Sequence, residues 1–539
     1  PTNVSAEGDD SSRTYTMDLV SPSTNIDLTM KVKISVDDND LTWEVTSIKK
    51  KDGCADIATI EIPQLNLLST DMSEENAAFD GVSPSTTTTQ SGDSHITWDN
   101  GFNPSTTGTY MYGFLSNGSL SGGVWSNSEI EDDKRITMNS GADSMSLTSS
   151  VWYYERGDKN GQAASYSYPT SDLPCAKVCI AGDANGDGDI DWNDGALAFR
   201  DIMNIAQGAD DIKDLVNYRI VMNFAGMATN PYLETADNIK KVYLATDGLP
   251  QAVMLKGYGN EGHDSANSEY ADVSEREGGI TDFQNLIKIA HQYNTEVGIH
   301  INAQEAYPEA KSFNETMLTS PITNGWGWLD QSFTINKLWD LGSQARYKRL
   351  VQLYDRINGT SFYSGNWDKG EYVKDSQGTL NASMSEIAAD AAKRTDNMDF
   401  IYLDVWYQNA WETRQIAKEI NSLGWRFSTE FGYEGEYDST WSHWATDAAY
   451  GGAGLKGWNS EIIRFLRNDQ RDTQILNYPR YGGTADNPLL GGYRLYGFEG
   501  WGGDQDYNSY ITETFTENLP TRFLQHYYVT DWEDYGEDE

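Results

Sequence analysis

The sequence predicts an all-β domain followed by an α/β domain, because two different hydrophobic patterns follow one another along the chain. Over residues 1–160, stretches such as LTMKVKISV, LTWEVTSI and SMSLTSSVWYYE alternate apolar and polar residues between turns rich in Ser, Thr, Gly and Asp. Alternation with a period of two, without a helical period of useful length, predicts antiparallel strands. We therefore expect a large β-sandwich over this first part of the chain.

The second pattern begins after a stretch of small residues, GQAASYSYPTSDLPC, and we expect a linker over residues 161–210. Over residues 211–539, apolar runs such as RIVMNFAG, KVYLAT, AVMLKGYG, EVGIHINAQ, DFIYLDVW and RFSTEFGY alternate with amphipathic helical stretches. Such alternation predicts a parallel sheet. Polar and aromatic residues gather just after each run, which favours a closed (β/α)8 TIM-like barrel over an open doubly wound sheet.

The length and the net charge of the chain limit the classes of protein to which it can belong. The 539 residues suffice for two large domains, and 82 acidic against 39 basic residues give a net charge of −43. This charge argues against nucleic acid and against anionic membrane surfaces as partners. No apolar run approaches 18 residues, so no membrane insertion is expected. We expect a secreted or cell-surface, extracellular protein, in which Cys175 and Cys179 could form a short-loop disulfide.

The segment DANGDGDIDWND, residues 183–194, has the spacing of an EF-hand calcium loop, with Gly188 at the turn. The expected oxygen ligands, at loop positions one, three, five, seven and twelve, are Asp183, Asn185, Asp187, Asp189 and Asp194. Aspartate at position twelve is typical of dockerin modules, but those carry two such loops and this sequence shows one. We expect a structural Ca²⁺ at a domain boundary; the alternative is an Asx-rich turn without an ion.

Two carboxylates lie at the ends of consecutive strand-like runs, Asp404 in DFIYLDVW and Glu430 in GWRFSTEFGYEG, with the helix-like AWETRQIAKEINSLG between them. In a barrel of parallel strands, both side chains enter one mouth, over the C-terminal ends of the strands. Either acid alone could be a structural ion-pair partner or a helix cap. Two acids at the same end favour catalysis, and a carboxylate pair is what cleavage of a glycosidic bond requires.

Further polar residues predict a binding site around this pair. His263 and Asp264, in the Gly-rich loop GYGNEGHDSA, can bond vicinal hydroxyl groups, and Asn302 and Glu305 follow the strand-like EVGIHINA. By contrast, the GxGxxG match in GGAGLKG lacks the strand and the downstream acid of a nucleotide site. The predicted ligand is therefore a polyol rather than a nucleotide.

Two tryptophans, Trp326 and Trp328 in NGWGWLDQ, lie in a glycine-flanked stretch that predicts a loop. Flat amphipathic rings suit the faces of sugars, so this pair can stack on a ring or close over one. The alternative is ordinary core packing.

These residues resemble glycoside hydrolase family 101, the endo-α-N-acetylgalactosaminidases. The resemblance covers most of residues 180–533 and rests on GEYDSTWSHWATDAAYGG, NPLLGGY, FEGW, YLDVW, KEIN–GWRF–E and GHD. The β-rich first domain resembles the supersandwich domain of that family more loosely, and the EF-hand-like segment also resembles the family pattern.

The resemblance implies a retaining hydrolase in which Asp404 is the nucleophile and Glu430 the acid/base. It implies release of the disaccharide Gal-β-1,3-GalNAc from Ser/Thr of mucin-type O-glycoproteins or glycopeptides, with the tryptophan pair as lid and wall. The substrate-binding residues expected from the pattern and the resemblance together are His263, Asp264, Asn302, Glu305, Trp326, Trp328, Glu499 and Trp501.

One departure from the family pattern concerns Gly502, which stands where the family has a glutamine that contacts the outer sugar. The preferred O-glycan core is therefore left open. Two other classes also stay open: a non-catalytic O-glycan-binding protein, and an exo-acting α-galactosidase-like glycosidase.

Overall fold

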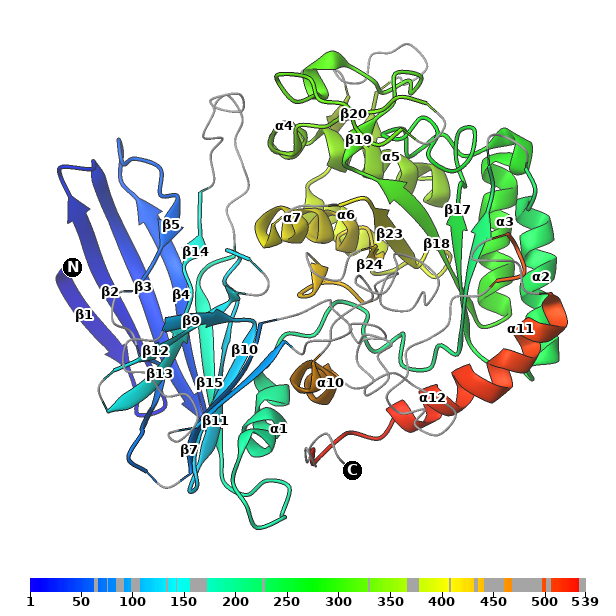
Figure 1. Cartoon of the computed structure of the whole chain (residues 1–539). Coiled ribbons are helices and arrows are strands. Elements are labelled where there is room, and N and C mark those ends of the chain that lie inside the picture. Colours follow the sequence, from blue (N-terminus) through cyan, green and yellow to red (C-terminus); the bar gives the residue numbers. More distant parts are fainter. Residues whose placement is uncertain are drawn as a thin grey trace.

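The computed structural model of the chain describes most of its residues. These are 1–62, 66–74, 76–83, 92–97, 107–131, 134–141, 143–155, 172–224, 228–327, 330–365, 378–406, 409–430, 435–440, 460–467, 497–500 and 506–532. Figure 1 shows a β domain beside a domain of parallel strands and helices, with α1 (Trp192–Ile202) and α10 (Glu461–Arg467) between them. The two helices contact each other, and α10 also contacts the β domain.

The first domain is built from antiparallel sheets, so the prediction of an all-β first part is confirmed. The larger sheet has nine strands, in the spatial order β1 (Thr2–Gly8), β2 (Ser12–Ser21), β3 (Ile26–Asp37), β4 (Asp40–Lys50), β15 (Cys175–Ala181), β11 (Ser121–Ser126), β10 (Tyr112–Asn117), β7 (Ala77–Val82) and β8 (Asp93–Thr97). The smaller strands are β6 (Leu68–Asp71), β13 (Ser144–Ser149), β12 (Ile136–Ser140) and β9 (Thr107–Tyr110) in one sheet, and the pair β14 (Trp152–Tyr153) and β5 (Thr59–Ile60).

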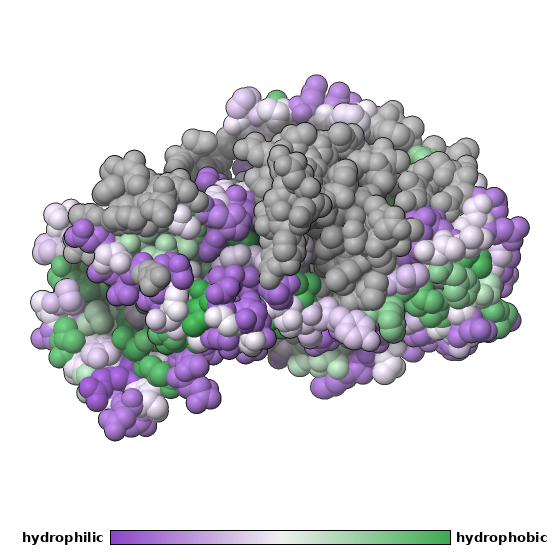
Figure 2. All heavy atoms as spheres, turned by 60° about the horizontal axis from the view of Figure 1, so that its bottom comes forward, coloured by the Kyte–Doolittle hydropathy of each residue, from purple (hydrophilic) through white to green (hydrophobic). Residues whose placement is uncertain are grey.

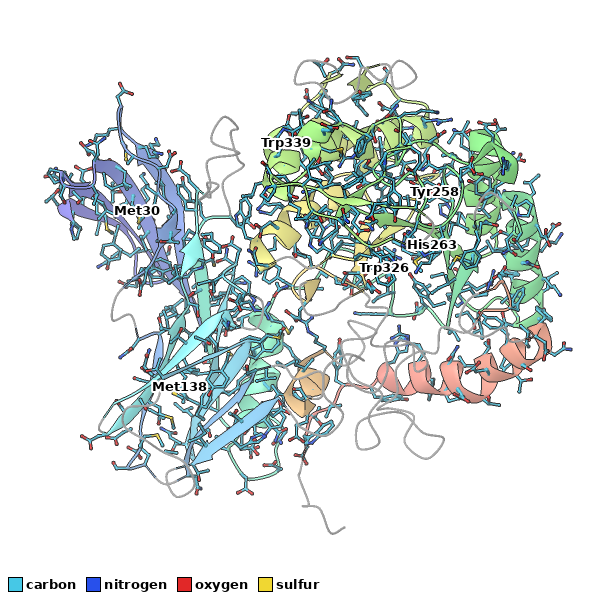
Figure 3. All side chains as sticks on the ribbon, turned by 45° about the horizontal axis from the view of Figure 1, so that its top comes forward. Met30, Met138, Tyr258, His263, Trp326 and Trp339 are labelled. Carbon is cyan, nitrogen blue, oxygen red and sulfur yellow. The ribbon has the colours of Figure 1, made fainter. Side chains whose placement is uncertain are left out.

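Alternation along these strands explains the core of the domain. On β12 and β13, every second residue (Ile136, Met138, Met145 and Leu147) packs against apolar side chains of the nine-stranded sheet. A second cluster forms under the outer strands around Met30. Figure 3 shows Met30 and Met138 in these two separate clusters.

Part of the expected linker, residues 161–210, belongs to this domain and corrects the prediction. Strand β15 pairs with β4 and β11 in the interior of the nine-stranded sheet. One face of β15 packs Val178 into the sandwich core, and the other packs Cys179 under Phe199 of α1. Because both faces are covered, this segment is a central strand and not a connection.

The second domain contains five parallel strands whose spatial order follows the chain: β16 (Asn217–Met222), β17 (Gln251–Lys256), β18 (Thr295–Asn302), β23 (Phe400–Asp404) and β24 (Arg426–Thr429). Sequential order is typical of a barrel wall, whereas a doubly wound sheet reverses direction at a switch point. The parallel sheet is confirmed; closure into an eight-stranded barrel stays a prediction.

Helices connect and cover these strands. The longer ones are α2 (Tyr232–Ala245), α3 (Gly279–Gln292), α5 (Ala345–Asn358) and α7 (Ala410–Asn421). The shorter elements are α4 (Lys337–Gly342), α6 (Met384–Ala391), α11 (Tyr507–Glu513), α12 (Leu519–Gln525), the turns η2 (Glu275–Glu277), η3 (Glu315–Met317) and η6 (Thr514–Asn518), and the hairpin strands β19 (Glu305–Ala306), β20 (Phe333–Thr334), β21 (Tyr363–Ser364) and β22 (Thr379–Leu380). The expected helix between the two carboxylates is α7, which begins at its cap Asn409.

The polar character of the surface agrees with the high net charge of the chain. On the face in Figure 2, hydrophilic residues cover much of the described surface, with smaller hydrophobic patches between them. Among the helices that the structure describes, none has the length and apolar character needed to cross a bilayer.

Candidate active site

Asp404 and Glu430 meet at the C-terminal ends of two adjacent parallel strands. Leu403 of β23 pairs with Thr429 of β24, so the next residue of each strand is one of the two acids. The backbone N–H of Glu430 donates to Leu403 O at 3.0 Å. Both acidic residues are only 5% exposed. The strand register therefore brings together the two carboxyl groups that the sequence singled out.

The backbone after Asp404 is strained and joins the pair. Val405 has a φ of +50°, in the left-handed region that a β-branched side chain rarely adopts. In this conformation its N–H donates to Oε2 of Glu430 at 3.1 Å. Strain of this kind persists where the surrounding structure fixes it, and it is common at functional sites.

Asp404 is surrounded by cationic and donor groups. His300 Nε2 donates to its Oδ2 at 2.7 Å, Tyr402 Oη donates to its Oδ1 at 3.2 Å, and Lys256 Nζ lies 4.0 Å from Oδ2. Burial alone would raise the pKa of Asp404, but Lys256 and His300 hold it well below its usual range. The carboxylate is therefore ionised and oriented by hydrogen bonds to both of its oxygens.

The pKa of Glu430 is shifted in the opposite direction. Burial, together with the charge of Asp404 and a hydrogen bond to its side chain, raises the pKa of Glu430 to about 9. Two carboxyl groups in contact cannot both ionise cheaply, so one of them keeps its proton. At neutral pH the site holds one carboxylate and one carboxylic acid.

Three of these residues, Lys256, His300 and Tyr402, were not predicted from the sequence. Strand register explains their position. Leu255 pairs with Ile299, and His300 pairs with Tyr402, so the three form a row across β17, β18 and β23. The signal was a polar residue at the same level of each apolar run, which is visible only once the register is known.

The GHD loop places His263 beside this row. Gly257 makes the turn after β17 with a φ of +99°, and a Cβ there would lie 2.2 Å from Asn223 O. The N–H of His263 donates to the same carbonyl at 2.8 Å. Its ring centroid lies 4.8 Å from that of His300, and its Nε2 lies 3.3 Å from Asp264 Oδ2.

The pKa values of His263 and Asp264 are shifted in opposite directions. Burial, with Lys256 and His300, lowers the pKa of His263 well below its usual value, and burial raises the pKa of Asp264. A neutral imidazole beside a carboxyl group can both donate to and accept from sugar hydroxyls. The structure thus places His263 and Asp264 close to Asp404.

The four side chains His263, Asp264, His300 and Asp404 have ligand atoms within 4.8 Å of one another, which is close enough to hold a metal ion. The ammonium group of Lys256, however, already supplies a positive charge 4.0 Å from Asp404. Since His300 also donates to Asp404, the donor set fits a hydrogen-bonding sugar pocket better than a cation site.

Asn302 and Glu305 connect strand β18 to the loop that carries Trp326. Asn302 is the register partner of Asp404, and its Nδ2 donates to Glu305 Oε2 at 3.1 Å. The other oxygen of Glu305 accepts the N–H of Trp326. A Cβ on Gly325 would lie 2.8 Å from that oxygen, so glycine permits this approach. These contacts hold a loop and do not point to direct sugar binding by Glu305.

Trp326 is 59% exposed, so core packing does not explain it. Figure 3 labels Trp326 and His263, both in the parallel-sheet domain. Its predicted partner Trp328 lies outside the described residues, as do Trp501 and Gly502.

Glu499, predicted to bind substrate, is engaged elsewhere. Arg219 Nε donates to its Oε2 at 2.8 Å, and Asn238 Nδ2 donates to its Oε1 at 3.2 Å. Both charged groups of the Arg219–Glu499 pair are buried. With both oxygens used, the geometry favours a buried structural ion pair.

The predicted calcium loop has an oxygen-rich donor set, which suits this hard cation. Asp183 Oδ1 accepts the N–H of Gly186 at 2.7 Å, and Asp187 Oδ1 accepts that of Asp189 at 2.8 Å. The buried Asp194 accepts N–H groups at both ends of the loop, from residues 184 and 191. The carboxylates are not gathered within 4.8 Å of one another, but their chemistry and order along the loop fit the ion.

The cysteine pair cannot form the disulfide considered from the sequence. Cys175 and Cys179 are both free and lie on one regular strand, β15. Four residues of strand span about 13 Å, whereas a disulfide joins Cα atoms about 4.4–6.8 Å apart.

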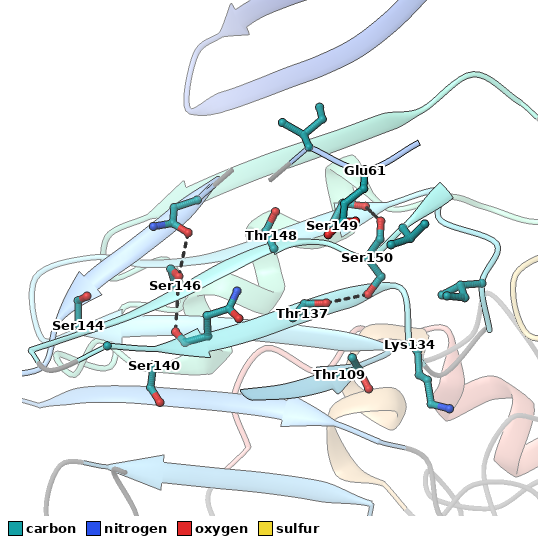
Figure 4. A pocket seen from close by; sticks show the side chains of 16 residues that line it. Glu61, Thr109, Lys134, Thr137, Ser140, Ser144, Ser146, Thr148, Ser149 and Ser150 are labelled. Atoms are coloured by element: carbon teal, nitrogen blue, oxygen red, sulfur yellow. Dashed lines mark hydrogen bonds between the residues drawn. The ribbon is translucent and has the colours of Figure 1, made fainter. Parts of the chain in front are cut away.

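A cavity of about 750 Å³ lies far from this chemistry, on the four-stranded sheet of the first domain (Figure 4). Hydroxyl groups line it, and they bond to their neighbours: Thr137 with Ser150 at 2.9 Å, and Ser146 with Asn66 at 3.1 Å. Its described lining contains a single carboxylate and so offers no acid pair. The carboxylates at the sheet edge are therefore the better candidate for the reaction.

The sequence of the chain is similar to those of known glycosidases. Residues 193–511 match the family model described as endo-α-N-acetylgalactosaminidase, and residues 1–192 match that of a galactose mutarotase-like fold domain. The chain belongs to glycoside hydrolase family 101. A curated protein of Renibacterium salmoninarum that carries the name endo-α-N-acetylgalactosaminidase is 36% identical over 389 residues, which cover 72% of this chain and 22% of that protein. The chain thus spans about a fifth of the length of this family-101 relative.

Solved structures are similar at low identity. An α-galactosidase of family 36 from Geobacillus stearothermophilus, in complex with stachyose, has a TM-score of 0.50 and 9% identity, covering 96% of this chain and 70% of its own. At this low identity, the similarity shows a shared fold and nothing more. An α-N-acetylgalactosaminidase, NagBb from Bifidobacterium bifidum, has a TM-score of 0.48 and 10% identity, covering 99% of this chain and 87% of its own.

Proposed function

We propose that this family-101 chain is a retaining endo-glycosidase, which releases Gal-β-1,3-GalNAc from Ser or Thr of mucin-type O-glycoproteins. The observation that carries the proposal is the position of two buried carboxyl groups, Asp404 and Glu430, at the ends of adjacent parallel strands. Their surroundings lower the pKa of Asp404 and raise that of Glu430. The first is suited to attack, the second to proton donation. Membership of the family supports the choice of glycosidic bond.

The reaction takes two steps. Asp404 attacks the anomeric carbon while Glu430 gives its proton to the Ser or Thr oxygen, so the glycosidic bond breaks and a glycosyl-enzyme forms. Glu430, now a carboxylate, takes a proton from water, and the resulting hydroxide displaces Asp404 from the sugar. The sugar leaves with its original anomeric configuration because the carbon has been inverted twice.

Close contact of the carboxyl groups supports retention. Retaining enzymes hold the pair about 5–5.5 Å apart, whereas inverting enzymes leave about 6.5–9.5 Å for a water molecule. A hydrogen bond joins the side chains of Glu430 and Asp404, which places the two carboxyl groups closer together than an inverting pair. Substrate between them would part the side chains towards the shorter of these separations.

The surrounding residues take supporting roles in the proposal. His263 and Asp264 bind the N-acetylgalactosamine, and Trp326 stacks on the glycan from its exposed loop. Lys256 and His300 keep Asp404 ionised and aligned. The five described strands continue into a closed (β/α)8 barrel, whose mouth carries these groups.

Calcium belongs to the proposal as a structural ion. Asp183, Asn185, Asp187, Asp189 and Asp194 would hold it at the entry to α1, where it would stabilise the junction between the domains. Extracellular calcium and mucin-type substrates would fit a secreted or cell-surface enzyme.

Defined O-glycopeptides test the proposal. We expect the product to be the disaccharide, and its first anomer seen by NMR to be α, before mutarotation. A β anomer would contradict retention, and a monosaccharide would favour the exo-acting alternative. If Asp404→Asn and the wild type both bind the glycopeptide and neither cleaves it, the chain is a glycan-binding protein.

A further inference from the structure

Residues 435–440 lie at the junction between the two domains, where a buried ion cluster holds Glu436. Glu436 is fully buried, and its carboxylate accepts a hydrogen bond from Tyr112 Oη at 2.7 Å. The same carboxylate lies 2.8 Å from Arg135 Nη1 and also pairs with Arg467. The first domain therefore reaches a segment that begins within six residues of the proposed acid/base.

The cluster is held together by Glu436 and Tyr112, each of which contacts both arginines. The guanidinium groups of Arg135 and Arg467 lie 5.0 Å and 5.7 Å from the ring centroid of Tyr112, one carboxylate joining all three. Tyr112 lies on β10, and Arg135 directly precedes β12. A buried carboxylate loses much when one partner is removed, because its charge is then left uncompensated.

The neighbouring residue, Tyr437, is fixed in the same way. Arg414 of α7 lies 3.7 Å from its ring centroid, and Asn204 Nδ2 donates to its carbonyl at 2.7 Å. Arg414 also donates to Asn127 O of the first domain at 2.6 Å. Trp125 of β11 lies against the ring, with 6.4 Å between the centroids.

The far end of this segment returns to the catalytic strand. Thr440 donates to Phe427 O from both its N–H, at 2.9 Å, and its Oγ1, at 3.2 Å. Phe427 belongs to β24, three residues before Glu430. Residues 435–440 therefore connect the strand that carries the acid/base to side chains of the other domain.

We infer that Tyr112 and Arg135 of the first domain are positioning residues for Glu430, acting through Glu436. The inference rests on the proposed function, since it concerns the acid/base of that reaction. It makes the β domain part of the catalytic apparatus and not an attached module. An error of about 1 Å in the placement of a catalytic group can reduce a rate by about 10²-fold.

The test uses two substrates, because a misplaced proton donor harms one more than the other. A glycopeptide has a poor leaving group and needs the proton, whereas an aryl glycoside with an activated leaving group needs it little. We expect Tyr112→Phe to lower kcat/KM for the glycopeptide by about 10-fold or more, and for the aryl glycoside by less than about 2-fold. Arg135→Lys, which keeps the charge, is the second variant and should act in the same direction.

Tyr110→Phe is the matched control, because it removes a hydroxyl group from the same domain but on β9, in the sandwich core. It should leave the ratio of the two activities unchanged. Equal loss on both substrates, or no loss on either in the folded variants, would overturn the inference. Failure of the proposed function looks different: Glu430→Gln itself would then slow both substrates equally.

Discussion

At the domain junction, Glu436 lies between two arginines, whereas at the edge of the parallel sheet Glu430 lies against the negative Asp404. Both glutamates are almost completely buried. The difference in their neighbours gives them different uses. A carboxylate enclosed by cations is fixed as an ion and holds structure, while one placed beside another carboxylate keeps its proton and can donate it.

The comparison extends to Asp404, which resembles Glu436 in being surrounded by donors but differs in what they leave available. At Glu436 the partners are a phenol on β10 and two guanidinium groups, one on α10 and one directly before β12. At Asp404 the partners are His300, Tyr402 and Lys256, all below the acid on the strands of the sheet. Such one-sided support keeps the carboxylate charged and leaves the mouth of the sheet for substrate.

The largest effect is expected from Asp404→Asn, which removes the nucleophile and nearly preserves its shape. Hydrolysis of glycopeptide and of aryl glycoside should both fall by at least about 10³-fold, because the carboxylate that attacks the anomeric carbon is lost. Glycopeptide binding, measured by calorimetry, should persist. Retained hydrolysis would remove Asp404 from the mechanism.

Glu430→Gln should show the next largest effect, and it should depend on the leaving group. The glycopeptide rate should fall by about 10²–10⁴-fold, the usual contribution of a general acid, while formation of the glycosyl-enzyme from an activated aryl glycoside should change much less. Burst kinetics would separate that first step from hydrolysis of the intermediate. Equal loss in the first step with both substrates would end the assignment of Glu430 as the acid.

Lys256→Met sharpens the comparison by removing a cation from the charged side of the pair. Without this ammonium group the pKa of Asp404 should rise, so the acid limb of the kcat/KM profile should move to higher pH, with kcat about 10-fold lower at neutral pH. Lys241→Met, on the outer helix α2, is the matched control. A profile identical to that of the control would show that Lys256 does not set the charge of the nucleophile.

Removal of calcium should affect the junction and not the chemistry. Chelation should lower the melting temperature by several degrees, since about 1 kcal/mol corresponds to about 2–4 °C in a domain of this size. Asp183→Asn should abolish the response to chelator. If melting is the same with and without chelator, the loop holds no ion.

The catalytic strands could be predicted because their apolar runs and terminal acids are local features. The helix between them, α7, and the position of Asp404 and Glu430 at one edge follow from the parallel connection. Strand β15 could not be predicted, because its partners β4 and β11 are distant in sequence and its surroundings look like a linker. The prediction of a strand-like run at KVYLAT was wrong, because this segment forms the end of helix α2.

The roles of individual acids could also be predicted only in part. Glu305 and Glu499 follow apolar runs as the catalytic acids do, but one holds the backbone of Trp326 and the other pairs with Arg219. Which partner an acid meets depends on contacts far apart in the chain, up to 280 residues for Arg219 and Glu499. Composition and spacing carry no trace of such contacts.

The most direct test of the account is a carboxyl titration of Glu430, by ¹³C NMR on glutamate-labelled enzyme, with Glu430→Gln to assign the resonance. The expected pKa is about 9, because burial and Asp404 raise it. The acid is then protonated below that pH, and kcat/KM for glycopeptide should fall as the pH rises through it. A pKa near the ordinary glutamate value of about 4.3 would contradict the claim that this pair holds one charge and one proton.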